Sequence, residues 1–169
     1  MAMKRLFLAI CVLFAAVACG PNEEPNGGNN ANDGQGGDTP TIYAVGDLYD
    51  ANGVQGVVFA ISEGGAHGKI VSVTEPSKKL EWAEANAWCS GQGEGWYCPN
   101  IDELVVLHSV STVINTTLEG VGAEKIKPQI YWSSEPKGKD YAYYVSMISG
   151  ESNHASTGFT ALVRAVSVF

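Results

Sequence analysis

The chain has 169 residues, of which 45% are hydrophobic and 17% are charged, and its formal net charge is −8. These proportions are typical of a compact globular protein and exclude a largely disordered chain. The acidic balance also argues against nucleic acid as a partner, because carboxylates and phosphate backbones repel each other.

The first 19 residues have the parts of a bacterial lipoprotein signal. Lys4 and Arg5 form a positive region, residues 6–18 form an apolar run, and Cys19 follows small residues. The run is too short to span a bilayer, which needs roughly 20 apolar residues. An ordinary secretory signal followed by a chance cysteine is the alternative. The small residues before Cys19 resemble the lipobox, however, which implies cleavage before Cys19 and lipidation of that cysteine.

The expected location follows from this anchor. A single acyl chain holds a protein on a membrane only marginally, whereas a multiply acylated Cys19 would be a stable membrane anchor. Glu23 and Glu24 lie just behind it and resemble the surface-export signals of some Gram-negative lipoproteins. We therefore expect a lipid-anchored protein of the outer membrane that faces the cell surface.

The next segment is predicted to be a tether. Residues 20–40 are rich in Gly, Asn and Pro and contain no aromatic residue, so they cannot bury enough apolar surface to fold. A coil of this length reaches roughly 25 Å. The predicted organisation is a signal peptide (1–18), the lipidated Cys19 with a flexible tether (19–40) and one domain (41–169), which has a typical size for a single core.

The domain is expected to begin with strands over residues 43–49, 54–62 and 69–74. Asn52-Gly53 between the first two is a strong hairpin signal. The strand over 54–62 is apolar on both faces, which predicts a central position in a sheet.

Two helices are expected next. The first covers residues 80–89, and the second begins at Ile101. Asn100 precedes Glu103 by three residues, which predicts a capping box at the start of the second helix. Two adjoining apolar stripes predict that this helix lies against a sheet.

The C-terminal part is expected to return to strands. A short strand is predicted over residues 130–133, a longer one over 141–148, and a last one over 159–168, after a turn at 149–152 and a polar stretch. Strands, then helices, then strands indicate an α+β fold with a mostly antiparallel sheet and two helices.

Three segments in this order resemble a family of exported bacterial domains with a C-type-lectin-like fold. They are GWYCPNIDEL at 95–104, YWSSE at 131–135 and VRAVSVF at 163–169. The family includes the C-terminal domain of collagen-like bacterial adhesins, and it is related to formylglycine-generating enzymes and to phage receptor binders. Cys98 and Asn100 depart from the usual Leu and Thr, but Asn caps a helix as well as Thr does.

Cys89 and Cys98 are the cysteines that remain in the mature domain besides Cys19. Outside the cytoplasm such a pair indicates a disulfide first. It would close a loop of about ten residues, worth roughly 2.7 kcal/mol in the chain-entropy model. Two separate buried thiols are the alternative. Formylglycine-generating enzymes use cysteines, but the residues around this pair do not match their motif.

No catalytic motif is found, and the protein is not expected to be an enzyme. His67, His108 and His154 are not spaced as metal ligands, so we expect neither a metal nor a cofactor. Asp102 and Glu103 are adjacent at a helix start, where carboxylates meet the macrodipole favourably, and we interpret them as structural.

Arg164 lies in an apolar run, so it should find a carboxylate or carbonyl partner and serve a structural role. The four tryptophans are interpreted as core residues rather than as ligand platforms. They are Trp82, Trp88, Trp96 and Trp132.

The best candidate binding surface comprises the polar segments 135–141 and 151–157 with the adjoining tyrosines. In the resembling family this C-terminal region carries the ligand face; solvated loops without a function are the alternative. The candidate ligand-binding residues are Tyr141, Tyr143, Tyr144, Asn153, His154, Ser156 and Thr157.

The sequence therefore favours a cell-surface lipoprotein with a non-catalytic ligand-binding or adhesion domain. Its expected partners are the membrane, through Cys19, and a glycan or protein of a host or bacterial surface. A periplasmic or pilus-associated structural lipoprotein that docks a partner protein is the alternative. A degenerate relative of an oxidase, with reactive thiols, is a third hypothesis.

Overall fold

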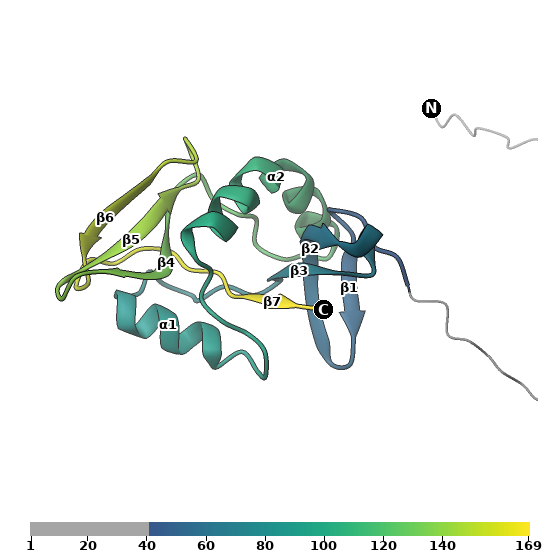
Figure 1. Ribbon diagram of the computed structural model, residues 1–169, viewed down its shortest axis with the longest axis horizontal. Coiled ribbons are helices and arrows are strands. Elements are labelled where there is room, and N and C mark those ends of the chain that lie inside the picture. The colour runs from purple at the N-terminus through teal and green to yellow at the C-terminus, as the bar shows by residue number, and fades with distance from the viewer. Residues whose placement is uncertain (1–40) are drawn as a thin grey trace, which may run out of the picture. The chain divides into compact units, whose positions relative to one another are not determined.

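The computed structural model describes residues 41–169, and the predicted signal peptide, Cys19 and the whole predicted tether lie outside the described residues (Figure 1). Within this range, two α-helices and two antiparallel sheets form an α+β fold, as the sequence predicts. The elements are β1 (Leu48–Ala51), β2 (Val54–Ser62), the 3-10 turn η1 (Glu63–Gly65), β3 (His67–Ser72), α1 (Trp82–Ser90), α2 (Ile101–Gly120), β4 (Ile130–Lys137), β5 (Tyr141–Ser146), β6 (Ser152–Ser156) and β7 (Val166–Val168).

The first sheet has the strand order β1-β2-β3-β7, and every neighbouring pair is antiparallel. The predicted hairpin joins β1 and β2, and both Asn52 (φ 56°) and Gly53 (φ 76°) adopt the left-handed conformation that such a two-residue turn requires. The central position predicted for β2 is confirmed, because β2 pairs with β1 on one side and β3 on the other.

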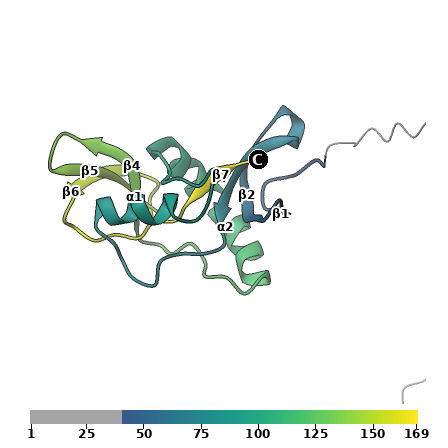
Figure 2. The same cartoon turned by 90° about the horizontal axis from the view of Figure 1, so that it is seen from below.

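The second sheet has the order β4-β5-β6. Figures 1 and 2 show it beside α1 at one end of the domain, with the hairpin of β1 and β2 at the other end. The segment that follows β6 ties the two sheets together: Leu162 bridges Tyr131 of β4 and Ala161 bridges Leu80 before α1, and the same segment continues into β7, which pairs with β3 of the first sheet.

Helix α2 packs against the first sheet, as its two apolar stripes predict. One core cluster joins Leu104, Leu107 and Leu118 of the helix to Val57 and Phe59 of β2, all of them essentially inaccessible to water. Burying one such side chain contributes about 1.5–3 kcal/mol. A second cluster surrounds the fully buried Trp132 and is formed by Leu80, Ala85, Cys89, Cys98, Ala142, Ala161, Val163 and Ala165.

The start of α2 is confirmed as a capping box. Asn100 Oδ1 accepts the Glu103 backbone N–H at 2.8 Å, and Glu103 Oε2 accepts the Asn100 backbone N–H at 2.8 Å. Two donors of the first turn that would otherwise lack partners are therefore satisfied.

Two strand predictions are wrong. Residues 152–156, expected to be a polar stretch, form β6, which carries almost no apolar side chain because it lies at the edge of its sheet with mostly exposed side chains. The sequence predicts the last strand over 159–168, but only its end forms a strand, β7. Before β7, Ala161 and Leu162 form isolated bridges instead of a continuous run of paired residues.

The first strand also differs from its predicted range of 43–49, since β1 covers Leu48–Ala51. The preceding residues make other contacts: the Tyr43 backbone N–H donates to Gly65 O, and Gly46 has a φ of 99° that interrupts extended backbone. Gly46 can adopt this angle because it lacks a Cβ atom.

Candidate functional site

One face of the second sheet collects several of the predicted binding residues. In the register of β5 and β6, Tyr141 lies opposite Ser156 and Tyr143 lies opposite His154. In the β4–β5 hairpin, Lys137 lies opposite Tyr141. Residues that face each other across antiparallel strands project to the same side of the sheet. We call these five residues the tyrosine–histidine face.

The side chains of this face contact one another. The His154 ring packs edge-on against Tyr141 and Tyr143, with centroids 5.8 and 6.3 Å apart. Lys137 Nζ lies 5.6 Å from the centre of the Tyr143 ring and donates to His154 Nδ1 at 3.0 Å. Tyr141 is 50% exposed, so the cluster is open to solvent.

This arrangement suits binding. Tyrosine rings offer large amphipathic contact areas at a low cost in side-chain entropy. Here the contacts among Lys137, Tyr143 and His154, together with the strand pairing beneath them, restrict the side chains further. The face therefore presents a partly ordered aromatic surface. The Lys137 ammonium, the Ser156 hydroxyl and the His154 ring nitrogens lie on the same side of the sheet.

Three predicted residues do not belong to this face. Tyr144 and Asn153 lie opposite each other on the other side of the sheet, because adjacent residues of a strand alternate sides. The Tyr144 ring packs edge-on against Trp132 at 6.3 Å. Thr157 lies beyond β6, where its backbone N–H donates to Asp140 O at 2.9 Å and connects the end of β6 to the turn between β4 and β5.

Lys137 lies within the predicted polar segment 135–141 but is not among the individual residues predicted to bind a ligand. The signal was present, because Gly138, Lys139 and Asp140 form the turn that places Lys137 opposite Tyr141. The side of the sheet on which Tyr141 lies could only be fixed once the strand register was known.

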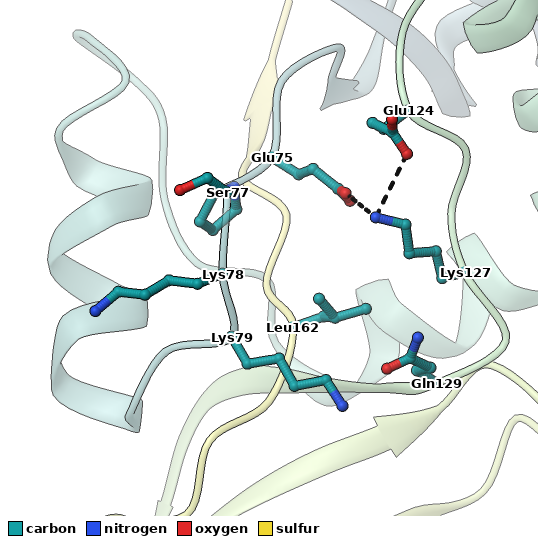
Figure 3. Close-up of a pocket in the computed structure, with 9 residues that line it drawn as sticks. Glu75, Ser77, Lys78, Lys79, Glu124, Lys127, Gln129 and Leu162 are labelled. Carbon is teal, nitrogen blue, oxygen red and sulfur yellow. Dashed lines mark hydrogen bonds and ion pairs between the residues drawn. The ribbon is translucent and has the colours of Figure 1, made fainter.

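A cup of about 430 Å³ opens elsewhere on the domain, at the opposite end of β4 from Lys137. Figure 3 shows Glu75, Lys79, Lys127 and Gln129 arranged around Leu162, whereas Lys78 points away. The lining residues are Glu75, Pro76, Ser77, Lys78, Lys79, Glu124, Lys127, Gln129 and Leu162.

The wall of this cup is an ion-pair network around Glu75. Its carboxylate, only 7% exposed, pairs with Lys127 Nζ and accepts Arg164 Nη2 at 3.0 Å. The fully buried Arg164 also donates to Ser72 O at 3.3 Å and Glu124 O at 2.6 Å. The carboxylate and carbonyl partners predicted for Arg164 are thus confirmed.

Lys127 is held as a cation in this network. The hydrogen bond from Lys127 to the Glu75 carboxylate raises the pKa of the Lys127 ammonium. Lys127 Nζ also lies 3.4 Å from Oε2 of the Glu124 carboxylate. The network connects three segments that are distant in the sequence, so we interpret the wall of the cup as structural.

A second buried network centres on Glu103. Its Oε1 accepts Lys69 Nζ and the Tyr97 hydroxyl, each at 2.7 Å, and its Oε2 accepts the Asn100 backbone N–H. Burial alone would raise the pKa of Glu103, but these three donors outweigh it and lower the pKa. An ionised carboxylate with all these donors in place stabilises the fold, as the sequence predicts for this position.

Cys89 and Cys98 are both buried in the second core cluster, and no bond joins their sulfurs. The neighbouring Cys89 thiol and burial both raise the pKa of Cys98. Cys98 also donates to Trp132 O at 3.8 Å. The structure brings the predicted pair together, and the disulfide itself stays a prediction.

The three histidines lie apart. His67 Nδ1 is 3.4 Å from Phe169 O, His108 packs against Gly150, and His154 belongs to the tyrosine–histidine face. Among residues 41–169, no group of three or more His, Cys, Asp or Glu side chains is placed to hold a metal ion. In the same range no helix is both long enough and apolar enough to cross a membrane.

The comparisons with known proteins give one assignment. No curated protein matches the chain. The family model of the Lcl C-terminal domain matches residues 62–167, which include the tyrosine–histidine face, the cup and both core cysteines. This match covers more than half of the sequence and most of the described domain, from the end of β2 to β7. The chain therefore belongs to the Lcl C-terminal domain family.

Proposed function

We propose that the protein is an exported lipoprotein, anchored through Cys19, whose C-type-lectin-like domain binds a surface ligand without catalysis. The ligand surface is the tyrosine–histidine face. The observation that carries this proposal is the packing of Tyr141, Tyr143 and His154 into one solvent-open aromatic cluster. Membership of the Lcl C-terminal domain family supports a surface-associated role for the domain.

The chemistry of this face favours binding over catalysis. His154 contacts the Lys137 ammonium, which donates to its ring. A general base needs a substrate proton within reach and a partner that orients its ring, and the partner of the His154 ring is an ammonium group rather than a carboxylate or a carbonyl. The buried Glu103 is no better placed as a catalytic base, because Lys69, Tyr97 and Asn100 already occupy its oxygens.

The expected ligand has apolar surface and hydroxyl or amide groups. The ring of Tyr141 can cover the apolar side of a sugar ring or of a protein side chain. The Ser156 hydroxyl and the Lys137 ammonium lie on the same side of the sheet, where they can hydrogen-bond the ligand. A glycan or a protein of a host or bacterial surface meets this description.

The test is an array of glycans and surface proteins probed with the full-length mature protein. Replacing Tyr141 and Tyr143 together by Ala should weaken binding at least tenfold. Asn153→Ala is the matched control, because Asn153 lies on the adjacent strand with its side chain on the other side of the sheet. Equal losses in both variants would contradict the assignment of the binding surface.

A second candidate function is the docking of a partner protein by a periplasmic or pilus-associated lipoprotein. Strand β6 favours it, because β6 pairs with β5 alone among the described strands and so leaves one edge open. An extended segment of a partner can add to such an edge. Protease treatment of intact cells distinguishes the two functions: a surface protein is digested, whereas a periplasmic one is protected.

A further inference from the structure

The two buried cysteines lie at the ends of a glycine-rich connection. Cys89 belongs to the last turn of α1, and Cys98 precedes the α2 cap residue Asn100 by two positions. Neither is accessible from the surface: Cys89 is 0% exposed and Cys98 is 4% exposed. Both side chains belong to the same buried cluster around Trp132, so the fold places the two cysteines in one small region of the core.

We propose that Cys89 and Cys98 are joined by a disulfide bond in the exported protein. The inference rests on the location outside the cytoplasm proposed above, where thiols are oxidised and disulfides persist. It concerns a covalent modification of the core and is independent of the ligand that the tyrosine–histidine face binds.

The oxidant is the disulfide of a thiol–disulfide oxidoreductase. One cysteine thiolate attacks this disulfide, which forms a mixed disulfide and releases one thiolate of the oxidant. The second cysteine thiolate then attacks the sulfur of the first, which closes the Cys89–Cys98 bond and releases the second thiolate of the oxidant. Two cysteine thiols lose two electrons and two protons, and the oxidant is reduced to a dithiol.

The bond should close before the core is packed. In the folded domain both sulfurs lie beneath the surface, out of reach of a protein oxidant. The pKa of Cys98 is also raised there, by the neighbouring Cys89 thiol and by burial, so the attacking thiolate is scarce. Oxidation of an already folded, reduced protein is therefore expected to be slow and to follow its unfolding.

The connection that the bond would close has little order of its own. It contains Gly93 (φ 135°) and Gly95 (φ 80°), both at angles that other residues rarely adopt. Helix α1 has only nine residues, too few to be stable without its packing. A bond from Cys89 to Cys98 would restrict the unfolded connection and fasten the end of α1 to the segment that leads into α2.

The direct test uses the full-length protein extracted from its native membrane. Free thiols are alkylated under denaturing conditions without reductant, and the chain is cleaved after glutamate. Glu94 lies between the two cysteines, so peptides 85–94 and 95–103 stay together only through a disulfide. We expect one linked species that reductant separates, and recovery of the two peptides separately alkylated would overturn the proposal.

The same sample reports the lipid on Cys19. A lipidated membrane protein with two alkylated core thiols would overturn the disulfide and leave the proposed location intact. If the chain carries no lipid, the purified full-length protein is reduced, unfolded and refolded in a mixture of reduced and oxidised glutathione. The linked peptides are again expected, and free thiols after refolding would overturn the pairing itself.

A stability measurement provides a control. Reductant should lower the melting temperature of the natural protein and leave that of the Cys89→Ala/Cys98→Ala double variant unchanged. Equal melting temperatures of the natural protein with and without reductant would contradict a disulfide. If the double variant does not fold, the peptide analysis still decides.

Discussion

The fully buried guanidinium of Arg164 donates to the carboxylate of Glu75 at 3.0 Å, although the two residues are 89 positions apart in the sequence. This ion pair fixes the segment after β3 to the segment before β7. Glu75 holds Lys127 with its other oxygen, so one carboxylate compensates two cations at the wall of the cup.

Replacing Glu75 by Gln should therefore destabilise the domain strongly. The change leaves the buried Arg164 without a counter-charge, and loss of one partner from a buried ion pair costs about 3–5 kcal/mol. Urea unfolding would measure the difference. The control is Glu119→Gln, which breaks the exposed pair with Lys125 and should cost less than about 1 kcal/mol. Similar losses of unfolding free energy in both variants would mean that the buried pair contributes no more to stability than the exposed one.

The Glu103 network predicts a loss of stability in acid. The hydrogen bonds to Glu103 place its pKa in the folded state below the ordinary value of 4.5. The unfolded chain therefore binds the proton more tightly than the folded one. The stabilisation is fully present above about pH 4.5 and is lost as the pH falls through the lower pKa of the folded state.

The measurement is the free energy of unfolding as a function of pH for the natural protein and for Glu103→Gln. The variant should be less stable at pH 7, and its stability should fall less steeply below pH 4.5, because it lacks the titrating carboxyl group. The control is Glu94→Gln, which removes an exposed carboxyl group from the loop between the two helices. A variant of Glu103 with the same acid slope as the natural protein would contradict the argument.

Much of the fold follows from local signals in the sequence. Asn52-Gly53 specifies a turn because both residues tolerate positive φ, and Asn100 with Glu103 specifies a helix start because each side chain satisfies a backbone donor of the other. The α+β class follows from the order of such segments. These features depend on neighbours a few positions away, so a pattern can reveal them.

The features that the sequence did not reveal depend on distant partners. Strand β6 has a polar sequence that forms a strand only because β5 offers it a ladder. The ion-pair network in the wall of the cup combines Glu75, Lys127 and Arg164 from three separate segments. The sequence predicts Tyr144 and Asn153 on one binding surface with Tyr143, and only the sheet register shows that they lie on the other side.

The cap of α2 gives a local stability prediction. Asn100→Ala removes the side-chain oxygen that accepts the Glu103 backbone N–H, which should cost about 0.5–2 kcal/mol. Asn100→Thr keeps an acceptor of similar reach and should cost much less. Thermal unfolding of both variants is the measurement. An alanine variant as stable as the threonine variant would show that Asn100 does not stabilise the helix as a cap.

The turn between β5 and β6 provides the last prediction, because it contacts α2. Gly150 has a φ of 76°, and an added Cβ would lie 2.7 Å from Nδ1 of His108. Gly150→Ala should therefore lose about 1–3 kcal/mol through the unfavourable φ, plus the cost of displacing the His108 ring.

Gly138→Ala separates the two contributions. Gly138 has nearly the same φ, 73°, but an added Cβ meets no atom within 4 Å. The loss of unfolding free energy in Gly138→Ala should come from the backbone angle alone. Urea unfolding should therefore show a smaller loss for Gly138→Ala than for Gly150→Ala. Adding His108→Ala to the Gly150 variant should recover the excess if the ring causes it. Equal losses at Gly138 and Gly150, with no recovery in the double variant, would show that the contact between this turn and α2 is not tightly packed.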